Sequence, residues 1–434
     1  MTIEKKAYRA AIVHSLDDPA QVAVDASYEY FEDGLMIVED GRITAVGNAA
    51  DLLGSLPPEV EVLTYTDALI TAGFIDTHIH LPQTGMVGSY GEQLLDWLNT
   101  YVFPCEKQFA DPAHSAEVAD IFLKELLRNG TTTALVFGSR HKESVDALFS
   151  AAQKLNLRMI AGKVMMDRNA PDYLVDTAES SYLDSKALIE RWHGKGRLHY
   201  AVTPRFAPTS TPEQLTLAGQ LLTEYPDLYM QTHISENLKE VEWVKALFPE
   251  RKNYLDVYDH FNLLGERSVF AHGVHLCDQE CQRLAETGSA VAFCPTSNLF
   301  LGSGLFNLPM AERHKLNVGL GTDVGAGTSF SILQTLNEAY KVMQLQDARL
   351  SPFKSLYLAT LGGARALRLD DRIGNLQEGT EADFVVLDFN ATPLLSYRMK
   401  QATSIEEKLF VLMTLGDDRT VSETYSAGVR VHKR

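Results

Sequence analysis

The stretch Gly73-Phe-Ile-Asp-Thr-His-Ile-His80 decides how the chain is expected to fold. It closes a run with strand character, Ala68 to Ile75, and carries two histidines, His78 and His80, at spacing i, i+2. Successive side chains of a strand alternate between its faces, so these two imidazoles share a face. Such a pair forms half of a tetrahedral metal site. Ordinary histidines near a turn have the same spacing, so the motif needs partners elsewhere in the chain.

The composition is that of a globular protein with a large core, 45% hydrophobic and 22% charged over 434 residues. Length alone suggests roughly three domains, although α/β barrels often run ~250 residues or more as one unit. The formal net charge of -18 argues against a nucleic-acid or anionic membrane partner, because phosphates need a basic surface. It favours a neutral or cationic small substrate.

The cysteines and the N-terminus indicate a reducing compartment. Four cysteines, Cys105, Cys277, Cys281 and Cys294, show neither the density nor the spacing of a disulfide framework, and we expect buried, reduced thiols. The N-terminus has no uninterrupted apolar segment of the signal-peptide kind. No apolar run approaches the length of a membrane span. These features predict a cytoplasmic protein without a membrane partner.

The sequence patterns at both ends of the chain predict short strands. The predicted strands are Tyr8–His14, Gly34–Val38, Ile43–Val46, Glu61–Tyr65, Ala382–Asp388 and two more between Val421 and Val431. An Asp-Gly turn joins the second and third as a hairpin. We therefore predict a small β-sandwich domain built from both termini, residues 1–69 and 375–434, with a barrel over residues 70–374 inserted between its halves.

The middle of the chain alternates short β-branched runs with longer amphipathic stretches, which predicts parallel strands buried on both faces. The strand candidates are Ile70–Asp76, Thr132–Phe137, Arg158–Met166, Leu198–Thr203, Tyr229–Thr232, Ser268–Ala271, Ala290–Cys294 and Val318–Gly321. Eight strand-helix units indicate an α/β fold of the (β/α)8, TIM-like barrel type. An open doubly wound sheet is the alternative, but the chain has no G-x-G-x-x-G turn and no Walker loop.

Polar residues, with Phe206 beside one of them, follow the predicted strands in phase with their rhythm. They are His78 and His80 after the first strand, Arg205 and Phe206 after the fourth, His233 and Glu236 after the fifth, His272 after the sixth and Asp323 after the eighth. Barrel active sites lie at the carboxyl ends of the strands, so these side chains are expected to converge. Each residue alone has an ordinary structural explanation, but the joint pattern predicts a metal site.

The chemistry of the set follows from its donors. His78, His80, His233 and Asp323 offer three nitrogens and one oxygen, which suits one Zn2+ per chain with an open position for water, and Fe2+ is also compatible. A bound cation makes hydroxide available at neutral pH. Glu236 is positioned to take the proton of that water and pass it on. His272 could hydrogen-bond the same water, and Asp323 could act as both ligand and proton acceptor.

Six segments carry a family resemblance over nearly the whole chain. They are Phe74-Ile-Asp-Thr-His-Ile-His-Leu-Pro-Gln83, Gly130-Thr-Thr-Thr133, Pro204-Arg-Phe-Ala-Pro-Thr209, Gln231-Thr-His-Ile-Ser-Glu236, Cys294-Pro-Thr-Ser-Asn298 and Gly321-Thr-Asp-Val-Gly-Ala-Gly327. The chain resembles the amidohydrolase superfamily of metal-dependent barrel hydrolases and, within it, the guanine deaminase family. The histidine pair and Thr-Asp are shared across the superfamily, whereas the combination of Gln83, Arg205-Phe206 and His233-x-x-Glu236 narrows the choice.

The resemblance implies hydrolysis of guanine to xanthine and ammonia, as a step of purine catabolism, by a homodimer. It implies that Gln83, Arg205, Phe206, Glu236 and His272 bind the base. Arginine matches the O6 and N7 acceptors of guanine, and glutamine offers a donor and an acceptor together. Members with two metals carry a modified lysine after the fourth strand, where this chain has Arg205, so one metal is implied. Lys163, on the third predicted strand, is expected to have a structural or supporting role.

Other functions stay open at this point. Another deaminase or chlorohydrolase of the superfamily, acting on an adenosine derivative, cytosine or a triazine, is the alternative within the same class. A non-catalytic scaffold barrel is the alternative outside it, and the complete ligand set argues against it. Deaminases of the cytidine type need Pro-Cys-x-x-Cys, which this sequence lacks. The segment 88–98 is expected to form a loop and helix that caps the pocket, meets a second subunit or packs on the barrel.

Overall fold

The computed structural model describes residues 5–90 and 97–434. The chain divides into two compact units, the first made of Met1–Ile75, Lys124–Thr133 and Ser331–Arg434 and the second of Asp76–Leu123 and Ala134–Phe330. Within the described residues, none of the helices has both the length and the apolar character required to cross a membrane.

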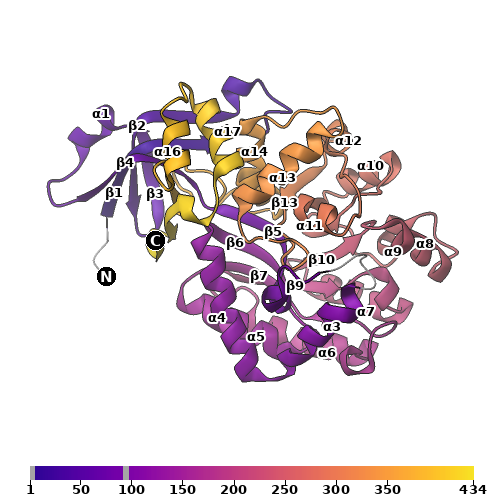
Figure 1. Ribbon diagram of the computed structural model, residues 1–434. Coiled ribbons are helices and arrows are strands. Elements are labelled where there is room, and N and C mark those ends of the chain that lie inside the picture. The colour runs from indigo at the N-terminus through magenta and orange to yellow at the C-terminus, as the bar shows by residue number, and fades with distance from the viewer. Residues whose placement is uncertain (1–4, 91–96) are drawn as a thin grey trace. The chain divides into compact units, whose positions relative to one another are not determined.

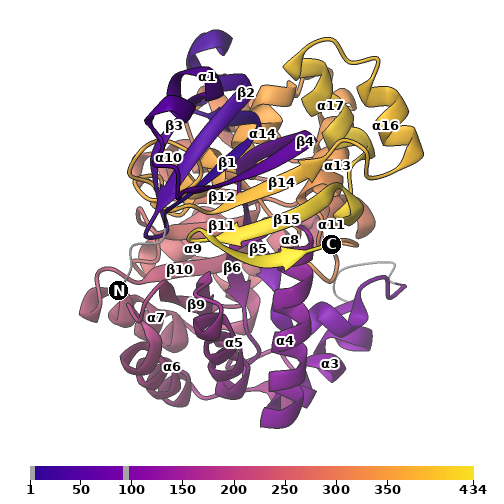
Figure 2. The ribbon, with the colours of Figure 1, turned by 90° about the vertical axis from the view of Figure 1, so that its left-hand side faces the viewer.

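Strands from both termini build the sheet of the first unit (Figure 2). Its order is β16-β15-β14-β4-β1-β2-β3, so the expected assembly from both ends of the chain is confirmed, and its seven strands form one continuous sheet. The bounds are Lys5–Ser15 for β1, Tyr28–Glu39 for β2, Arg42–Asn48 for β3, Glu61–Ala72 for β4, Phe384–Asp388 for β14, Val421–Ser426 for β15 and Val429–Lys433 for β16. Tyr8 and Met36 pack in one apolar cluster, whereas their neighbours Ala7 and Leu35 pack in another, as alternation requires.

The predicted hairpin is confirmed. Strands β2 and β3 pair antiparallel, and Asp40 and Gly41 join them with φ values of 50° and 78°. A two-residue turn that matches the twist of a hairpin needs positive φ at both positions, which aspartate tolerates and glycine adopts without strain. The remaining helices of the first unit are α1 (Ala49–Leu52), α13 (Ile332–Gln344), α14 (Pro352–Ala359), α15 (Leu361–Ala366), α16 (Pro393–Met399) and α17 (Ile405–Leu415).

The second sheet is the expected parallel barrel. Its order is β5-β6-β7-β9-β10-β11-β12-β13, with the two-residue strand β8 (Val164–Met165) beside β9. The bounds are Phe74–His80, Thr131–Phe137, Arg158–Gly162, Leu198–Pro204, Tyr229–Ile234, Ser268–His272, Ala290–Phe293 and Asn317–Leu320, in that order. The barrel closes where the N–H of Asp323 donates to the carbonyl of His78 and the N–H of His80 donates to that of Val324, both at 2.9 Å.

Helices cover the outside of the barrel strands, and α5 and α6 pack on β7 and β9 (Figure 1). The helices are α3 (Phe103–Lys107), α4 (Pro112–Arg128), α5 (Lys142–Lys154), α6 (Ala178–Trp192), α7 (Pro212–Glu224), α8 (Leu238–Leu247), α9 (Tyr254–His260), α10 (Asp278–Glu286), α11 (Pro295–Phe300) and α12 (Leu308–Arg313). Helix α6 begins after Thr177, whose hydroxyl accepts from the N–H of Ser180, as a helix N-terminus requires.

Three details differ from the sequence-based prediction. The strand predicted over Ile70–Asp76 is two strands, because the chain passes at Gly73 from β4 to β5. A Cβ at Gly73 would lie 2.3 Å from the hydroxyl of Thr132, so the close approach that permits this crossing needs glycine. The strand predicted over Arg158–Met166 is interrupted at Lys163. All four cysteines are free, but Cys277 is exposed rather than buried.

Candidate active site

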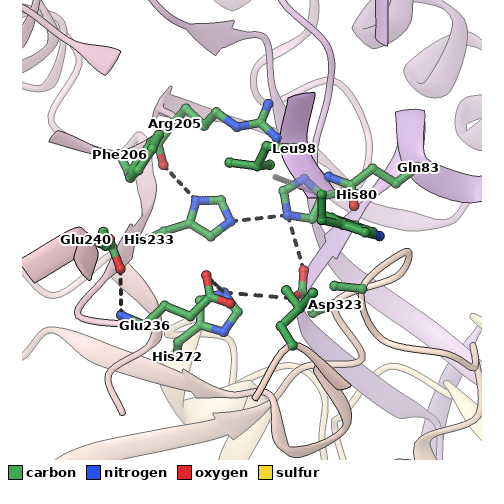
Figure 3. A pocket seen from close by; sticks show the side chains of 13 residues that line it. His80, Gln83, Leu98, Arg205, Phe206, His233, Glu236, Glu240, His272 and Asp323 are labelled. Atoms are coloured by element: carbon green, nitrogen blue, oxygen red, sulfur yellow. Dashed lines mark hydrogen bonds and ion pairs between the residues drawn. The ribbon is translucent and has the colours of Figure 1, made fainter. Parts of the chain in front are cut away.

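A pocket of about 420 Å3 opens at the carboxyl ends of the barrel strands (Figure 3). The residues that line it are His80, Gln83, Trp97, Leu98, Arg205, Phe206, His233, Glu236, Glu240, His272, Leu301, Asp323 and Ala326. In Figure 3, Arg205 and Gln83 lie on one side of the pocket, and Glu236 and His272 lie on the opposite side.

Four donor atoms converge beside this pocket. The Nε2 atom of His80 lies 3.3 Å from Nε2 of His78 and 3.2 Å from Nε2 of His233. Oδ1 of Asp323 lies 3.2 Å from Nε2 of His78 and 3.3 Å from Nε2 of His80. A tetrahedral zinc ion with bonds of ~2.0–2.1 Å would separate its ligand atoms by ~3.3–3.4 Å. The four predicted ligands therefore have the spacing and the donor types that fit one such ion.

Hydrogen bonds fix how these ligands face the centre of the cluster. Nδ1 of His233 lies 2.7 Å from the backbone carbonyl of Arg205. Because a carbonyl only accepts, Nδ1 carries the proton, and Nε2 presents its lone pair to the cluster. The carboxylate of Asp76 accepts from the N–H groups of His78 and Thr322, which anchors the strand that carries the histidine pair.

Burial sets the protonation of the cluster. It lowers the pKa of His78 to about 4 and also lowers the pKa of His80 and of His233. Burial alone would raise the pKa of Asp323, but the neighbouring His78 and His80 hold it well below its usual range. At neutral pH the three imidazoles are therefore neutral and the aspartate is ionised, which is the state that binds a divalent cation.

Glu236 and His272 form a second pair beside the first. Oε2 of Glu236 lies 3.5 Å from Nε2 of His272, which is also 3.8 Å from Oδ2 of Asp323. Ser303 donates to Oε1 of Glu236 at 3.2 Å, and Nδ1 of His272 lies 2.9 Å from the amide oxygen of Asn298. Burial raises the pKa of Glu236 to about 7, a value suited to proton transfer near neutral pH.

The backbone around this pair is held in sparsely populated conformations. Ser235, His272 and Asp323 have φ values of 48°, 73° and 50°, in the left-handed region. The carboxylate of Glu240 accepts from the N–H groups of Glu236 and Asn237 and so fixes the turn that carries the glutamate. Strained residues of this kind are typical of functional sites, where the surrounding structure holds them.

The predicted base-binding residues lie on the same pocket. Gly325 donates its N–H to Oε1 of Gln83 at 3.1 Å, which fixes the orientation of the amide and leaves its nitrogen as a donor for a ligand. Nη1 of Arg205 donates to both oxygens of Glu106, at 2.8 and 2.9 Å, and both side chains are buried. Phe206 contributes to the wall of the pocket.

Sequence reasoning did not find several residues of the site. The ring of Phe137 packs against His78, His80 and His233 at 4.6–5.0 Å between centroids, and its position at the end of β6 was the available signal. Glu240 could have been found from the spacing Asn237-x-x-Glu240, a capping box that begins α8. Glu106 carries no local signal, because its partner Arg205 is 99 positions away.

Two other predicted features lie outside the pocket or outside the described residues. The ammonium group of Lys163 is buried and donates to Asp176, so it has the structural role expected for it. The predicted loop and helix at 88–98 includes residues 91–96, which are outside the described residues. Trp97 and Leu98, at its end, line the pocket.

Comparison with known proteins was consistent across sequence and structure. The model of the amidohydrolase family matches residues 69–431. A guanine deaminase of Escherichia coli is 56% identical over 98% of this chain and 96% of its own. The solved E. coli guanine deaminase superposes with a TM-score of 0.95 over 99% of both chains at 54% identity. The guanine deaminase of C. acetobutylicum with bound guanine is 28% identical, with a TM-score of 0.89 over 99% of this chain and 100% of that one.

Proposed function

We propose that this chain, which belongs to the amidohydrolase family, is a guanine deaminase. It hydrolyses guanine to xanthine and ammonia. The observation that carries the proposal is the convergence of four metal-donor atoms and the Glu236–His272 pair in one pocket. The 28% identical structure with bound guanine supports the choice of base, because that chain is covered along its whole length.

We assign His78, His80, His233 and Asp323 as ligands of one divalent cation, with Zn2+ preferred and Fe2+ as the alternative. When bound, the cation supplies a reactive water at neutral pH, because it lowers the pKa of that water to ~7. The neutral state of the three imidazoles supports this assignment.

The residues of the chain then divide between binding the base and moving protons. Guanine is planar and neutral, and carries O6 and N7 acceptors on one edge, which an arginine matches with two donors. Arg205, Gln83 and Phe206 hold this edge on one side of the pocket. The amino-bearing carbon C2 then faces the opposite side, where Glu236 and His272 lie.

Glu236 carries the proton transfers. It takes a proton from the attacking water and delivers it to N3 of the base, which prepares the amino group to leave as ammonia. His272 orients the water through Nε2, because its Nδ1 is held by Asn298. The ionised Asp323 is assigned a share in the later transfers as an acceptor beside the same water.

Guanine is expected to release ammonia in the presence of the holoenzyme, and prolonged dialysis against a chelator should abolish that release. The four donors jointly bind the cation, and a chelator that removes the cation also removes the reactive water. The measurement is ammonia from guanine before chelation, after it, and after adding back Zn2+ or Fe2+. Adenine nucleosides, cytosine and a triazine serve as comparison substrates. Faster turnover of one of these than of guanine would replace the proposed substrate.

We expect kcat/KM to fall with acid below about pH 7. Glu236 must be unprotonated to accept a proton, burial raises its pKa to about 7, and a neighbouring cation lowers that value. The acid limb therefore lies at or below pH 7 and represents the protonation of this carboxyl. A profile of kcat/KM from pH 5 to 9, at constant ionic strength and with metal content checked at each pH, measures it. A flat profile across pH 5 to 7 would contradict this role for Glu236.

Several finer assignments are proposed on the family resemblance alone. They are a homodimer and a role in purine catabolism. The cytoplasmic location and the domain boundaries 1–69, 70–374 and 375–434 are proposed from the sequence patterns instead. Light scattering of the purified full chain tests the homodimer.

A further inference from the structure

Arg205 places a buried positive charge on the wall of the pocket. Among the described lining residues it is the one guanidinium or ammonium group, and only 3% of its surface is exposed. A guanidinium does not lose its proton under any ordinary condition. A bare cation in this position would draw anionic ligands into the site, because electrostatic interactions strengthen where water is excluded.

Glu106 lies against this charge and is fully buried. Both of its oxygens accept from the single nitrogen Nη1, at 2.8 and 2.9 Å, so the edge of the guanidinium that carries Nε and Nη2 is not used by this carboxylate. The pair therefore keeps directional donors on the arginine while its net charge is close to zero.

The pair is also held from both sides. Glu106 belongs to α3, whose Phe103 ring lies 5.5 Å from Cζ of Arg205. The backbone N–H of Arg205 donates to Met165, and its carbonyl accepts from His233. The guanidinium is thus fixed between α3 and the end of β9, and Glu106 is placed to set both its direction and its charge.

We propose that Glu106 is a positioning residue that determines charge specificity: by neutralising Arg205 it makes the pocket select neutral purines over anionic ones. The inference rests on the proposed function and deepens it. Guanine is neutral near pH 7, whereas xanthine is a stronger acid and ionises as the pH rises. The substrate is then bound through hydrogen bonds, and the ionised product is disfavoured.

The test compares one ligand in two charge states. The inhibition constant of xanthine against guanine turnover is measured from pH 6 to 9 for the wild type and for Glu106→Gln. Hypoxanthine stays neutral over most of this range, so the pH dependence of its inhibition constant corrects for titration of the enzyme. In the wild type the corrected constant should rise as xanthine ionises. In E106Q the preference for the neutral form should shrink or invert, by roughly tenfold or more, the scale of one charge interaction near a protein surface.

Matched variants separate charge from folding. Glu106→Asp keeps the charge and should keep the wild-type ratio of the two forms even if both bind more weakly. Glu179→Gln, which removes an exposed acid from the first turn of α6, should leave the ratio unchanged. If thermal melting shows that E106Q is not folded, the wild-type measurement still tests the proposal. Wild-type enzyme that binds anionic xanthine as tightly as neutral xanthine would overturn it. An unchanged ratio in folded E106Q overturns it too. Absence of ammonia from guanine would instead refute the proposed function.

Discussion

Replacing Glu236 with glutamine is expected to slow guanine turnover at least ~100-fold while guanine and the cation remain bound, because a positioned general acid–base group contributes ~10²–10⁴-fold. Glutamine keeps the size of the side chain and still accepts from Ser303, but it cannot take a proton at neutral pH. The loss should therefore appear in kcat, with little change in the dissociation constant of guanine.

The measurement is kcat for ammonia release together with equilibrium binding of guanine and the metal content of the purified variant. Glu242→Gln, an exposed acid on the same helix α8, is the matched control and should retain wild-type turnover. Near-normal turnover of E236Q, with metal bound, would exclude Glu236 as the proton carrier.

Replacing His80 with alanine is expected to remove both metal and activity. Its Nε2 atom lies within 3.3 Å of His78, His233 and Asp323, so it touches every other donor of the cluster. Mutation of a residue that only hydrogen-bonds to a metal ligand typically lowers metal affinity or activity 10–100-fold. Loss of a proposed ligand itself should therefore lower metal affinity and turnover at least ~100-fold. Metal content by elemental analysis should fall in parallel with turnover.

His260→Gln is the control for this variant, because His260 is exposed at the end of α9 and distant in sequence from all the proposed ligands. Circular dichroism should show that both variants fold. Full metal content in H80A, with the wild-type rate, would remove His80 from the ligand set.

The barrel could be predicted because its strands are apolar on both faces and recur with a strand-helix rhythm that few folds share. The phase of that rhythm also placed His233, His272 and Asp323 at one edge. What the pattern could not reveal was contact between distant segments. Glu106 lies on a short helix without any periodic signal, and the role proposed for it depends on its hydrogen bonds to the buried Arg205.

The boundary between β4 of the first sheet and β5 of the second was not predicted, for a related reason. The run from Ala68 to Ile75 contains no charged residue and is interrupted only by Thr71 and Gly73, so hydrophobicity alone does not separate β4 from β5. The separation depends on Gly73, whose N–H donates to Asp383, while the N–H of Phe74 donates to Gly130. These two partners are distant from Gly73 and from each other in the sequence, so no local sequence pattern predicts them.

The bond from Nδ1 of His233 to Arg205 uses the main-chain oxygen of the arginine, whereas Glu106 engages the side chain. One residue thus serves two tasks through atoms that can be exchanged independently. A mutation at position 205 replaces the guanidinium to which we assign base binding but retains the backbone oxygen that orients His233. Redesign toward a different heterocycle could therefore begin at position 205, with the proposed metal ligands unchanged.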